Sequence, residues 1–266
     1  MLLNDGGALQ VERVVLHARP MQWSPHYQVP SQRLVLPASG ATEFSFNGQA
    51  VLLDGITALC LPSGLPYRMK PLAEAARTSI VVSARAGAED ALPPPRAWLL
   101  SPRALLQLRR HWRALAREAS VAVQYATPRV LRAVLEPGAL AGASSPSNSS
   151  ADRVAAAVHR AKSFMATRIG ATDGDMAPWT LNDVADAACC SPFHLARTFH
   201  RATGLSLHGY RQRLRLAAAL QRLEEGERDL AALAHDLGFS SQSHLGEAFR
   251  RWVGATPGSV RAELAG

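Results

Sequence analysis

The stretch "LGFSSQSHLGEAFRRWVGATP", from Leu237 to Pro257, resembles a stretch that the chain has already used. The earlier one, "ACCSPFHLARTFHRATGLS", runs from Ala188 to Ser206. Both contain a His-Leu pair, a Phe, an adjacent basic residue and a Gly at matching intervals. This repeat predicts that the C-terminal part of the chain builds the same short helical unit twice.

Each repeat carries the signals of a helix-turn-helix. In "LNDVADAACCSPFHLARTFHRATG" we expect a helix of about eight residues, a short turn and a second helix of about twelve. Ser191 followed by Pro192 marks the start of the second helix, and Gly204 marks its end. The later repeat has a turn one residue longer. Since the second helix of such a unit can enter the major groove, DNA binding is the leading hypothesis.

The two second helices are predicted to be amphipathic. The residues expected in the core are Leu195 and Phe199 in the first repeat and Leu245, Phe249 and Trp252 in the second. Between the repeats, "YRQRLRLAAALQRLEE" predicts a connecting helix with Arg211 and Arg215 on one face and leucines on another. A rigid connector of this kind would give one chain two reading helices, about one DNA turn or ~34 Å apart.

The net charge of the chain favours an anionic partner, but the positive charge is not concentrated in the C-terminal part. The net charge is +8 and the sequence pI is near 10.2. Lys and Arg minus Asp and Glu give 15 − 9 = +6 for residues 1–150 and 14 − 12 = +2 for residues 151–266. A claim of DNA binding for the C-terminal part therefore depends on which helix faces carry the arginines.

The cysteines and the hydrophobic pattern place the protein in the cytoplasm. The three cysteines, Cys60, Cys189 and Cys190, form neither a disulfide framework nor a zinc spacing. Neither a signal peptide nor an apolar stretch near the ~18 residues of a membrane span is recognisable.

The N-terminal region predicts an all-β domain. "QRLVLP", "TEFSFNGQAVLL", "ITALCLP" and "RTSIVVSAR" are predicted strands, and Asn47-Gly48 predicts a hairpin turn inside the second of these segments. Turns rich in Gly and Pro separate the strands, which indicates a small sandwich or barrel.

The middle of the chain predicts helices. Ser101-Pro102 and Thr127-Pro128 are both helix-start signals. The first helix has an apolar seam formed by Leu105, Leu108, Trp112 and Leu115, which packs either on its own domain or in a dimer interface. Residues 96–132 also hold eight arginines and a single Glu, which indicates either a solvated basic face or a DNA-contacting surface.

The segment "GALAGASSPSNSSA" is small, polar and aperiodic, and predicts a flexible linker. After it, Val154, Val158, Ala161, Met165 and Ile169 predict one apolar helix face. "TLND", at Thr180 to Asp183, predicts a capping box at the next helix start. The expected domains are a β-barrel at 1–95, a helical and dimerising segment at 96–137, a linker at 138–151 and a DNA-binding domain at 152–266.

From about Ala151 to Leu264 the chain resembles the DNA-binding domain of the AraC/XylS transcriptional regulators. The residues that carry the resemblance are "SPFHLARTFHRATGLS", "RLRLAAALQRL" and "LAHDLGFSSQSHLGEAFRRWVGATP". Leu207 departs from the Pro that many relatives have there. Upstream, "LLDGITALCLPSGLPYRMKP" resembles the cupin-like sensing domains of the same family. The implied fold is α+β: a cupin-like β-barrel, then helices, then an all-α domain with two helix-turn-helix motifs.

The resemblance also implies a set of DNA contacts. The expected base-reading residues are Phe193, Ala196 and Arg197 in the first unit and Gln242, Ser243, His244, Gly246 and Glu247 in the second. The expected phosphate contacts are Ser191, Arg201, Arg211, Arg215, Ser241, Arg250 and Arg251. The implied partners are double-stranded DNA, RNA polymerase, a small-molecule effector and a second copy of the chain, with no membrane partner.

Other classes of function have weaker support in the sequence. A metal-binding cupin needs clustered histidines and a Glu, whereas His17 and His26 are isolated and Glu43 has no histidine near it in sequence, so we expect no metal and no other cofactor. Cys189-Cys190 is either a vicinal redox switch or a pair of small turn residues. The alternatives to a regulator are a cupin-like binding protein with a helical interaction tail and a cupin-type enzyme. Because no catalytic motif stands out, we expect a non-enzyme.

Overall fold

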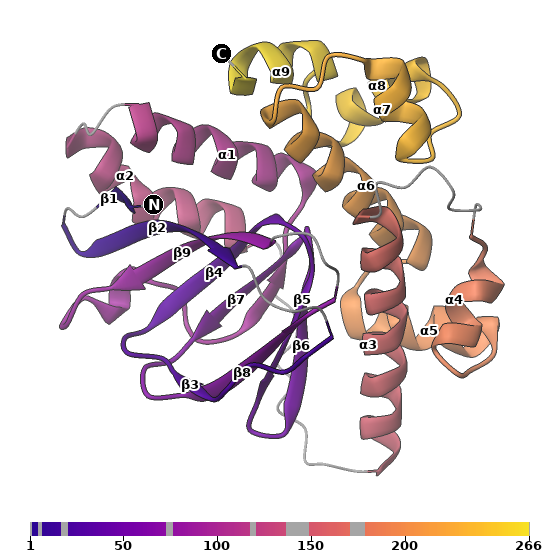
Figure 1. Ribbon diagram of the computed structural model, residues 1–266, viewed down its shortest axis with the longest axis horizontal. Helices are drawn as coiled ribbons and strands as arrows, with labels where there is room; N and C mark the ends of the chain where they lie inside the picture. Colours follow the sequence, from indigo (N-terminus) through magenta and orange to yellow (C-terminus); the bar gives the residue numbers. More distant parts are fainter. Residues whose placement is uncertain are drawn as a thin grey trace.

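The computed structural model describes residues 2–4, 7–16, 21–72, 77–117, 121–136, 149–170 and 179–265. Strands occupy the N-terminal region and helices follow it (Figure 1). The strands are β1 (Leu2–Asn4), β2 (Leu9–Leu16), β3 (Tyr27–Gln28), β4 (Arg33–Ser39), β5 (Thr42–Phe46), β6 (Gln49–Leu53), β7 (Thr57–Leu61), β8 (Pro66–Pro71), β9 (Arg77–Ala84) and β10 (Ala97–Leu99). The helices are η1 (Glu89–Ala91), α1 (Pro102–Arg117), α2 (Val121–Leu135), α3 (Ser149–Gly170), α4 (Leu181–Ala187), α5 (Pro192–Thr203), α6 (Leu207–Glu224), α7 (Leu230–Asp236), α8 (Gln242–Trp252) and α9 (Pro257–Ala265).

The N-terminal region is all-β, as predicted, but its described strands form two sheets that do not close into one barrel. A six-stranded sheet has the order β1-β2-β9-β4-β7-β10, and a four-stranded sheet has the order β3-β8-β5-β6. Strand β7 shows how they pack, because successive side chains of a strand point to opposite faces. Leu59 and Leu61 join the small core that includes Phe44 of the smaller sheet, whereas Ala58 and Cys60 join the large core that includes the helices.

The predicted strands are all present, and the hairpin at Asn47-Gly48 is confirmed. Both residues have positive φ, 49° and 72°, which is the conformation that a tight hairpin turn requires. Strand β2 was not predicted, although it pairs with β9 along its whole length. Its sequence, LQVERVVL, places charged residues among the apolar ones and so lacks a clean alternation.

Helix α1 confirms its predicted cap, since the Ser101 hydroxyl accepts a hydrogen bond from the Ala104 backbone N–H at 3.1 Å. Its apolar seam is buried within its own chain. The second predicted helix start was wrong, because α2 begins at Val121 and Pro128 lies inside the helix. The buried Thr127 hydroxyl does not cap a helix start, because it pairs with His111 Nε2 at 2.9 Å.

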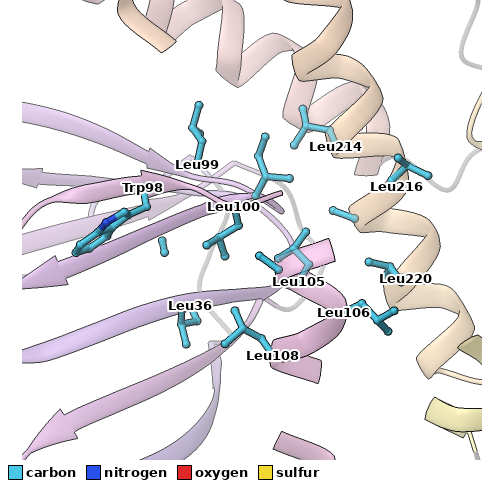
Figure 2. Packing of buried hydrophobic residues seen from close by; sticks show 14 of the residues in the cluster. Leu36, Trp98, Leu99, Leu100, Leu105, Leu106, Leu108, Leu214, Leu216 and Leu220 are labelled. Atoms are coloured by element: carbon cyan, nitrogen blue, oxygen red, sulfur yellow. The ribbon is translucent and has the colours of Figure 1, made fainter. Parts of the chain in front are cut away.

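The core of the molecule is continuous between the N-terminal region and the C-terminal helices (Figure 2). Leu36 of the large sheet and Leu105 and Leu106 of α1 belong to the same buried cluster as Leu216 and Leu220 of α6. Gly55 also lies close to α6, since a Cβ there would stand 3.4 Å from the Ala217 Cβ. Helix α6, which connects the two repeated units, is therefore packed directly on the β region, the strands from β1 to β10.

Three basic side chains of α1 contact other elements of the chain, while the role of the other arginines in residues 96–132 stays a prediction. The buried Arg109 forms an ion pair with Glu224 at the end of α6 and donates to the Ala38 carbonyl at 3.1 Å. Arg110 pairs with Glu263 at 2.5 Å, and Arg113 donates to the Leu264 carbonyl. These three arginines attach α1 to α6 and α9.

A buried polar contact joins the two regions at the centre of this interface. Tyr210 of α6 donates its hydroxyl to Asp54 Oδ2, while the other carboxyl oxygen accepts from the Ile56 N–H at 3.1 Å and the Thr57 hydroxyl at 2.7 Å. Burial, and then Asp54, raise the pKa of Tyr210 well above its ordinary value, so Tyr210 remains a donor at neutral pH. Lys162 of α3 is buried nearby, with its Nζ 5.6 Å from the centroid of the Tyr210 ring.

Glu43 is not isolated in space. His159 of α3 approaches it, with 3.2 Å between Nε2 and Oε1, and Lys70 Nζ lies 2.7 Å from its other oxygen. The partner comes from another region of the chain, so the sequence around Glu43 could not reveal it. Helix α3 begins at Ser149, within the segment predicted as linker, and residues 138–148 of that segment lie outside the described residues. The predicted apolar face of α3 is confirmed, with Ala161 and Met165 fully buried.

Candidate nucleic-acid interface

The first helix-turn-helix consists of α4 and α5, joined by residues 188–191. The predicted capping box is present, because the Thr180 hydroxyl accepts from the Asp183 N–H and the Asp183 side chain accepts from the Thr180 N–H. These hydrogen bonds to Thr180 lower the pKa of Asp183. The Ser191 hydroxyl accepts from the His194 N–H at the start of α5, and Gly204 ends that helix with a φ of 70°.

The turn between α4 and α5 contains Cys189 and Cys190. Cys189 is exposed and has a φ of 56°, a left-handed conformation that non-glycine residues seldom adopt. The Cys190 N–H donates to the Ala185 carbonyl at 3.1 Å and so closes the turn. Both thiols are free, and Cys190 is half-buried whereas Cys189 is exposed, so the choice between small, partly buried turn residues and a redox switch stays open.

The outer face of α5 contains the residues predicted to read bases. Phe193, Ala196 and Arg197 are exposed, whereas Leu195 and Phe199 on the opposite face are fully buried. Phe193 leaves 78% of its surface accessible, which is unusual for an aromatic side chain. The Arg197 guanidinium lies 5.8 Å from the centroid of the Phe193 ring one helical turn earlier. The helix therefore presents a paired aromatic and cationic surface to solvent.

The second unit consists of α7 and α8, joined by residues 237–241, one residue more than in the first unit. Gln242, Ser243, His244 and Glu247 are exposed on α8 and Gly246 is half-buried, in the pattern of the first unit. His244 Nδ1 lies 3.0 Å from the Ser240 hydroxyl, and its ring meets Phe239 edge-on. His244 is thus held against its own turn.

The expectation that Trp252 belongs to the core was wrong. Its side chain is 37% exposed, while Leu245 and Phe249 on the same helix are fully buried. Trp252 is the last residue of α8, and the buried neighbour Val253 takes the core position at this point. Because α8 ends at Trp252, the helical spacing no longer determines which side chain is buried at this point. The spacing of the repeat in the sequence does not show where the helix ends.

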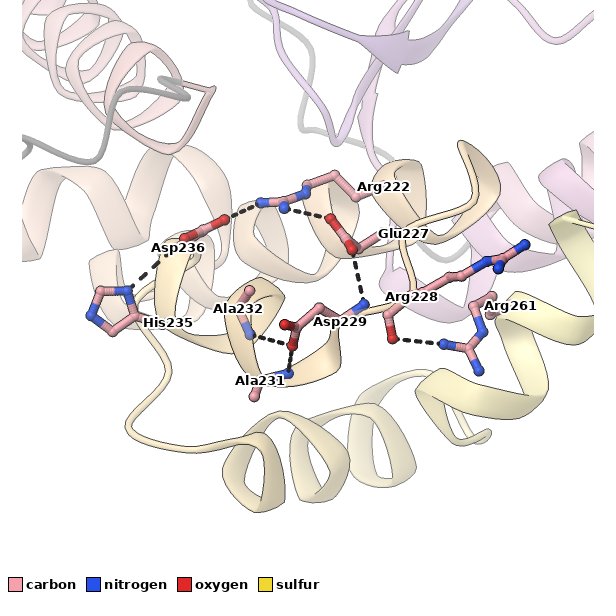
Figure 3. Close-up of polar contacts among 9 residues, drawn as sticks. All are labelled: Arg222, Glu227, Arg228, Asp229, Ala231, Ala232, His235, Asp236 and Arg261. Carbon is pink, nitrogen blue, oxygen red and sulfur yellow. Dashed lines mark hydrogen bonds and ion pairs between the residues drawn. The ribbon is translucent and has the colours of Figure 1, made fainter.

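Charged side chains fix the second unit to the end of α6 (Figure 3). Arg222 of α6 binds both Asp236 of α7 and Glu227 of the intervening loop, each at 2.7 Å. The Arg222 hydrogen bond lowers the pKa of Glu227. Asp229 caps α7 by accepting from the N–H groups of Ala231 and Ala232, each at 2.9 Å. As a result, α8 is held in a defined position relative to α6.

The residues predicted to contact phosphate fall into two groups. Ser191, Arg201, Ser241, Arg250 and Arg251 are exposed at the ends of α5 and α8. The other two predicted residues, on α6, are partly buried against aromatic rings.

On α6, the Arg211 guanidinium lies 3.8 Å from the centroid of the Trp179 ring, and the Arg215 guanidinium lies 5.7 Å from that of Phe239. Burial, and then the charge of Arg211, lower the pKa of Arg215 to about 10, which still leaves it charged at neutral pH. These packing contacts leave the phosphate roles of Arg211 and Arg215 as predictions.

Sequence reasoning missed two arginines beside the second unit. Arg228 and Arg261 line a shallow depression together with Gln242. The Arg261 guanidinium donates to the Arg228 carbonyl at 2.9 Å (Figure 3). Arg228 precedes α7 and Arg261 lies on α9, so neither belongs to the repeated motif. Only the packing of α9 against α8 brings them to the side of a predicted base-reading residue.

A family profile described as a helix-turn-helix domain matches residues 184–263, which run from α4 into α9. A protein of Streptomyces lividans described as an AraC-like transcription regulator is 40% identical over 83 residues, which are 31% of this chain and 27% of that protein. The C-terminal domain belongs to the AraC type. The HTH-type transcriptional regulator GlxA of Rhizobium meliloti (strain 1021) is 41% identical over 80 residues, which are 29% of this chain and 24% of GlxA.

The chain thus matches about a quarter of the length of these curated relatives. The crystal structure of ToxT from Vibrio cholerae O395 aligns with 97% of this chain and 99% of its own, at 11% sequence identity and a TM-score of 0.37. A likeness at that score supports no argument about this protein.

Two other classes of site are not found in the part of the chain that the structure describes. None of its helices is long and apolar enough to cross a membrane. No three His, Cys, Asp or Glu side chains of the described residues gather as metal ligands would.

Proposed function

We propose that this protein is a sequence-specific DNA-binding transcription regulator whose two helix-turn-helix units read successive major-groove segments of one duplex. One observation carries this proposal: α5 and α8 stand at the two ends of α6, each with a buried apolar face and an exposed face of polar, aromatic and basic residues (Figure 1). A shared connector presents two reading helices without requiring a second chain.

The exposed side chains have the chemistry to distinguish bases. The Arg197 guanidinium can donate to guanine O6 and N7, and the Gln242 amide can pair with adenine N6 and N7. Glu247 can accept from cytosine N4 but repels phosphate. Gly246 has no side chain to read a base, and only a flexible Arg250 nitrogen, at 3.8 Å, lies within 4 Å of a Cβ built there. We therefore expect α5, through Arg197, to contribute more to base specificity than α8.

Phosphate contacts would position the two helices on the duplex. The N-termini of α5 and α8, at Ser191 and Ser241, present backbone N–H groups that favour an anion. Arg201, Arg250 and Arg251 are exposed on the same two helices and supply positive charge. Arg228 and Arg261 extend this set beside Gln242.

The N-terminal region would control DNA binding. Because α6 is packed on the β region through Tyr210 and Glu224, a change in that region reaches the helix that sets the spacing of the reading helices. We propose a small-molecule effector or dimerisation as the cause of such a change, RNA polymerase as the partner at the promoter, and the bacterial cytoplasm as the compartment.

The test is selection of binding sites from random duplex DNA by the full chain, followed by footprinting. We expect a preferred site with two protected major-groove segments about 10 bp apart, and an affinity that falls steeply as the salt concentration rises towards ~0.2 M. Failure to enrich any sequence at low salt would overturn the proposal.

Variants separate base reading from charge. Arg197→Ala is expected to cost about 1–3 kcal/mol on the best site and to relax the preference at one base pair. The matched control is Arg129→Ala, at an exposed arginine on α2, far in sequence from both units, which should leave affinity unchanged. Equal losses for the two variants would mean that only net charge matters.

A second candidate is a small-molecule-binding protein whose helical part mediates protein contacts. It is favoured by the size of the β region and its packing on α6. Arg197→Ala together with Gln242→Ala distinguishes the two functions, because both side chains are exposed and lie outside the core: a regulator loses its cellular role in this variant and a binding protein keeps it.

A further inference from the structure

A cleft of about 270 Å³ lies between the segment that leads from η1 into β10 and the C-terminal half of α2. Its apolar walls include Leu92 and Pro93 from the first segment and Leu131 and Leu135 from α2. The cleft belongs to the N-terminal region and has no residue in common with the DNA-reading helices or with the contacts that join α6 to the β region.

Four charged side chains also line this cleft, two of each sign: Arg96, Arg132, Asp90 and Glu136. All four are exposed, and none of them forms an ion pair with a described residue. The Arg96 guanidinium lies 5.2 Å from the centroid of the Trp98 ring, within range of a cation–π contact. Two guanidinium groups and two carboxyl groups are therefore present in one small space without neutralising one another directly.

Trp98 supports the same wall from behind. Its side chain is fully buried, and its indole N–H, which has no acceptor among the described residues, is covered by its neighbours. The ring thus gives the Arg96 guanidinium a rigid surface at the edge of the cleft.

We propose that this cleft binds a small zwitterion with an apolar side group, of the class of the apolar α-amino acids. The charged lining as a whole is neutral, so a simple anion is attracted by the arginines and repelled by the carboxyl groups, whereas a zwitterion satisfies both signs. The carboxylate would pair with Arg96 and Arg132, the ammonium with Asp90 and Glu136, and the side group with Leu131 and Leu135. At about 30 Å³ per water molecule, the cleft has room for about nine water molecules, which is enough for a small amino acid such as leucine.

Ligand binding here would reach the DNA-reading region through β10 and α1. Strand β10 pairs with β7, and α1, which follows β10, carries Arg109 to Glu224 on α6. This regulatory consequence rests on the proposed function, whereas the binding of the ligand does not. The two ideas can therefore fail separately.

The test is isothermal titration of the full chain with four probes. Leucine is expected to bind saturably, while glycine, 4-methylpentanoate and 3-methylbutylamine, which lack the side group, the ammonium and the carboxylate respectively, should bind more weakly by about tenfold or more. No saturable binding of leucine, or equal binding of 4-methylpentanoate, would overturn the proposal.

Variants locate the site. Arg132→Gln and Glu136→Gln should each weaken leucine binding by about tenfold. Arg129→Gln, at an exposed residue of the same helix that does not line the cleft, is the control and should bind like the wild type. If Arg132→Gln also binds like the wild type while its circular dichroism is unchanged, the ligand does not occupy this cleft.

DNA binding is measured on the same samples. Leucine binding without any sequence-preferring DNA complex would contradict the proposed function and leave the ligand site standing. A DNA complex without leucine binding would contradict the ligand site alone.

Discussion

Tyr210→Phe tests whether the C-terminal domain is fixed to the β region by the buried hydrogen bond to Asp54. Tyr210 is fully buried and Asp54 is 1% exposed. The variant keeps the ring, and with it the edge-on contact with Phe199 at 5.2 Å between centroids, so that only the hydroxyl is lost. Asp54 keeps the Ile56 N–H and the Thr57 hydroxyl on one oxygen but loses the donor to the other.

The magnitude follows from the cost of a buried polar atom that loses its partner, about 1–3 kcal/mol. For a chain of this size, 1 kcal/mol shifts the melting temperature by roughly 2–4 °C, so a loss of about 2 kcal/mol lowers it by roughly 4–8 °C. Differential scanning calorimetry measures this shift. Tyr125→Phe is the matched control, because Tyr125 is 74% exposed and should change stability by less than about 0.5 kcal/mol.

A double-mutant cycle with Asp54→Asn assigns the effect to this pair. If the hydroxyl acts through Asp54, the two single losses are not additive, and the coupling energy is about 0.5–3 kcal/mol. The reasoning is refuted if Tyr210→Phe melts within about 1 °C of the wild type, or if the losses of the two variants add without coupling.

Three further predictions concern stability. Leu220→Ala, in the fully buried core of α6, should cost about 2–5 kcal/mol in urea unfolding, and a cost below 1 kcal/mol would mean that α6 is not packed on the β region as described. Gly204→Ala should cost about 1–2 kcal/mol of stability because Gly204 has a φ of +70°, a left-handed conformation that disfavours a side chain. A Cβ there meets no atom within 4 Å, so the cost would come from the backbone conformation alone. An unchanged melting temperature would show that the left-handed conformation is not required. Burial lowers the pKa of His111, so the unfolded chain takes up this proton more readily than the folded one. The resulting loss of stability is absent well above the unfolded pKa of about 6.5, grows as the pH falls from there to the lowered folded pKa, and is constant below it. His111→Gln should therefore lose less stability than the wild type between about pH 7.5 and pH 5.5.

The candidate site was largely predictable because its signals are local. Ser191 and Ser241 each bond to an N–H three residues away, and Gly204 adopts its own φ, so the sequence around each of them determines the helix ends. The four-residue periodicity then determines which side chains of α5 and α8 are buried and which are exposed. Trp252 marks the limit of this reasoning, since it follows the periodic pattern and yet lies at a helix end, where Val253 is buried in its place.

The sequence by itself determined the two repeated helical units, their caps and turns, the order of the strand and helix regions, and the exposed faces that make DNA the proposed partner. Only the tertiary structure decided what those regions pack against. Asp54 meets Tyr210 across 156 residues, Arg109 meets Glu224 across 115, and Glu43 meets His159 between separate regions of the chain. Local periodicity limits the conformation of each segment, but a charged or polar side chain finds its partner through the packing of whole sheets and helices, and short-range sequence signals do not record that choice.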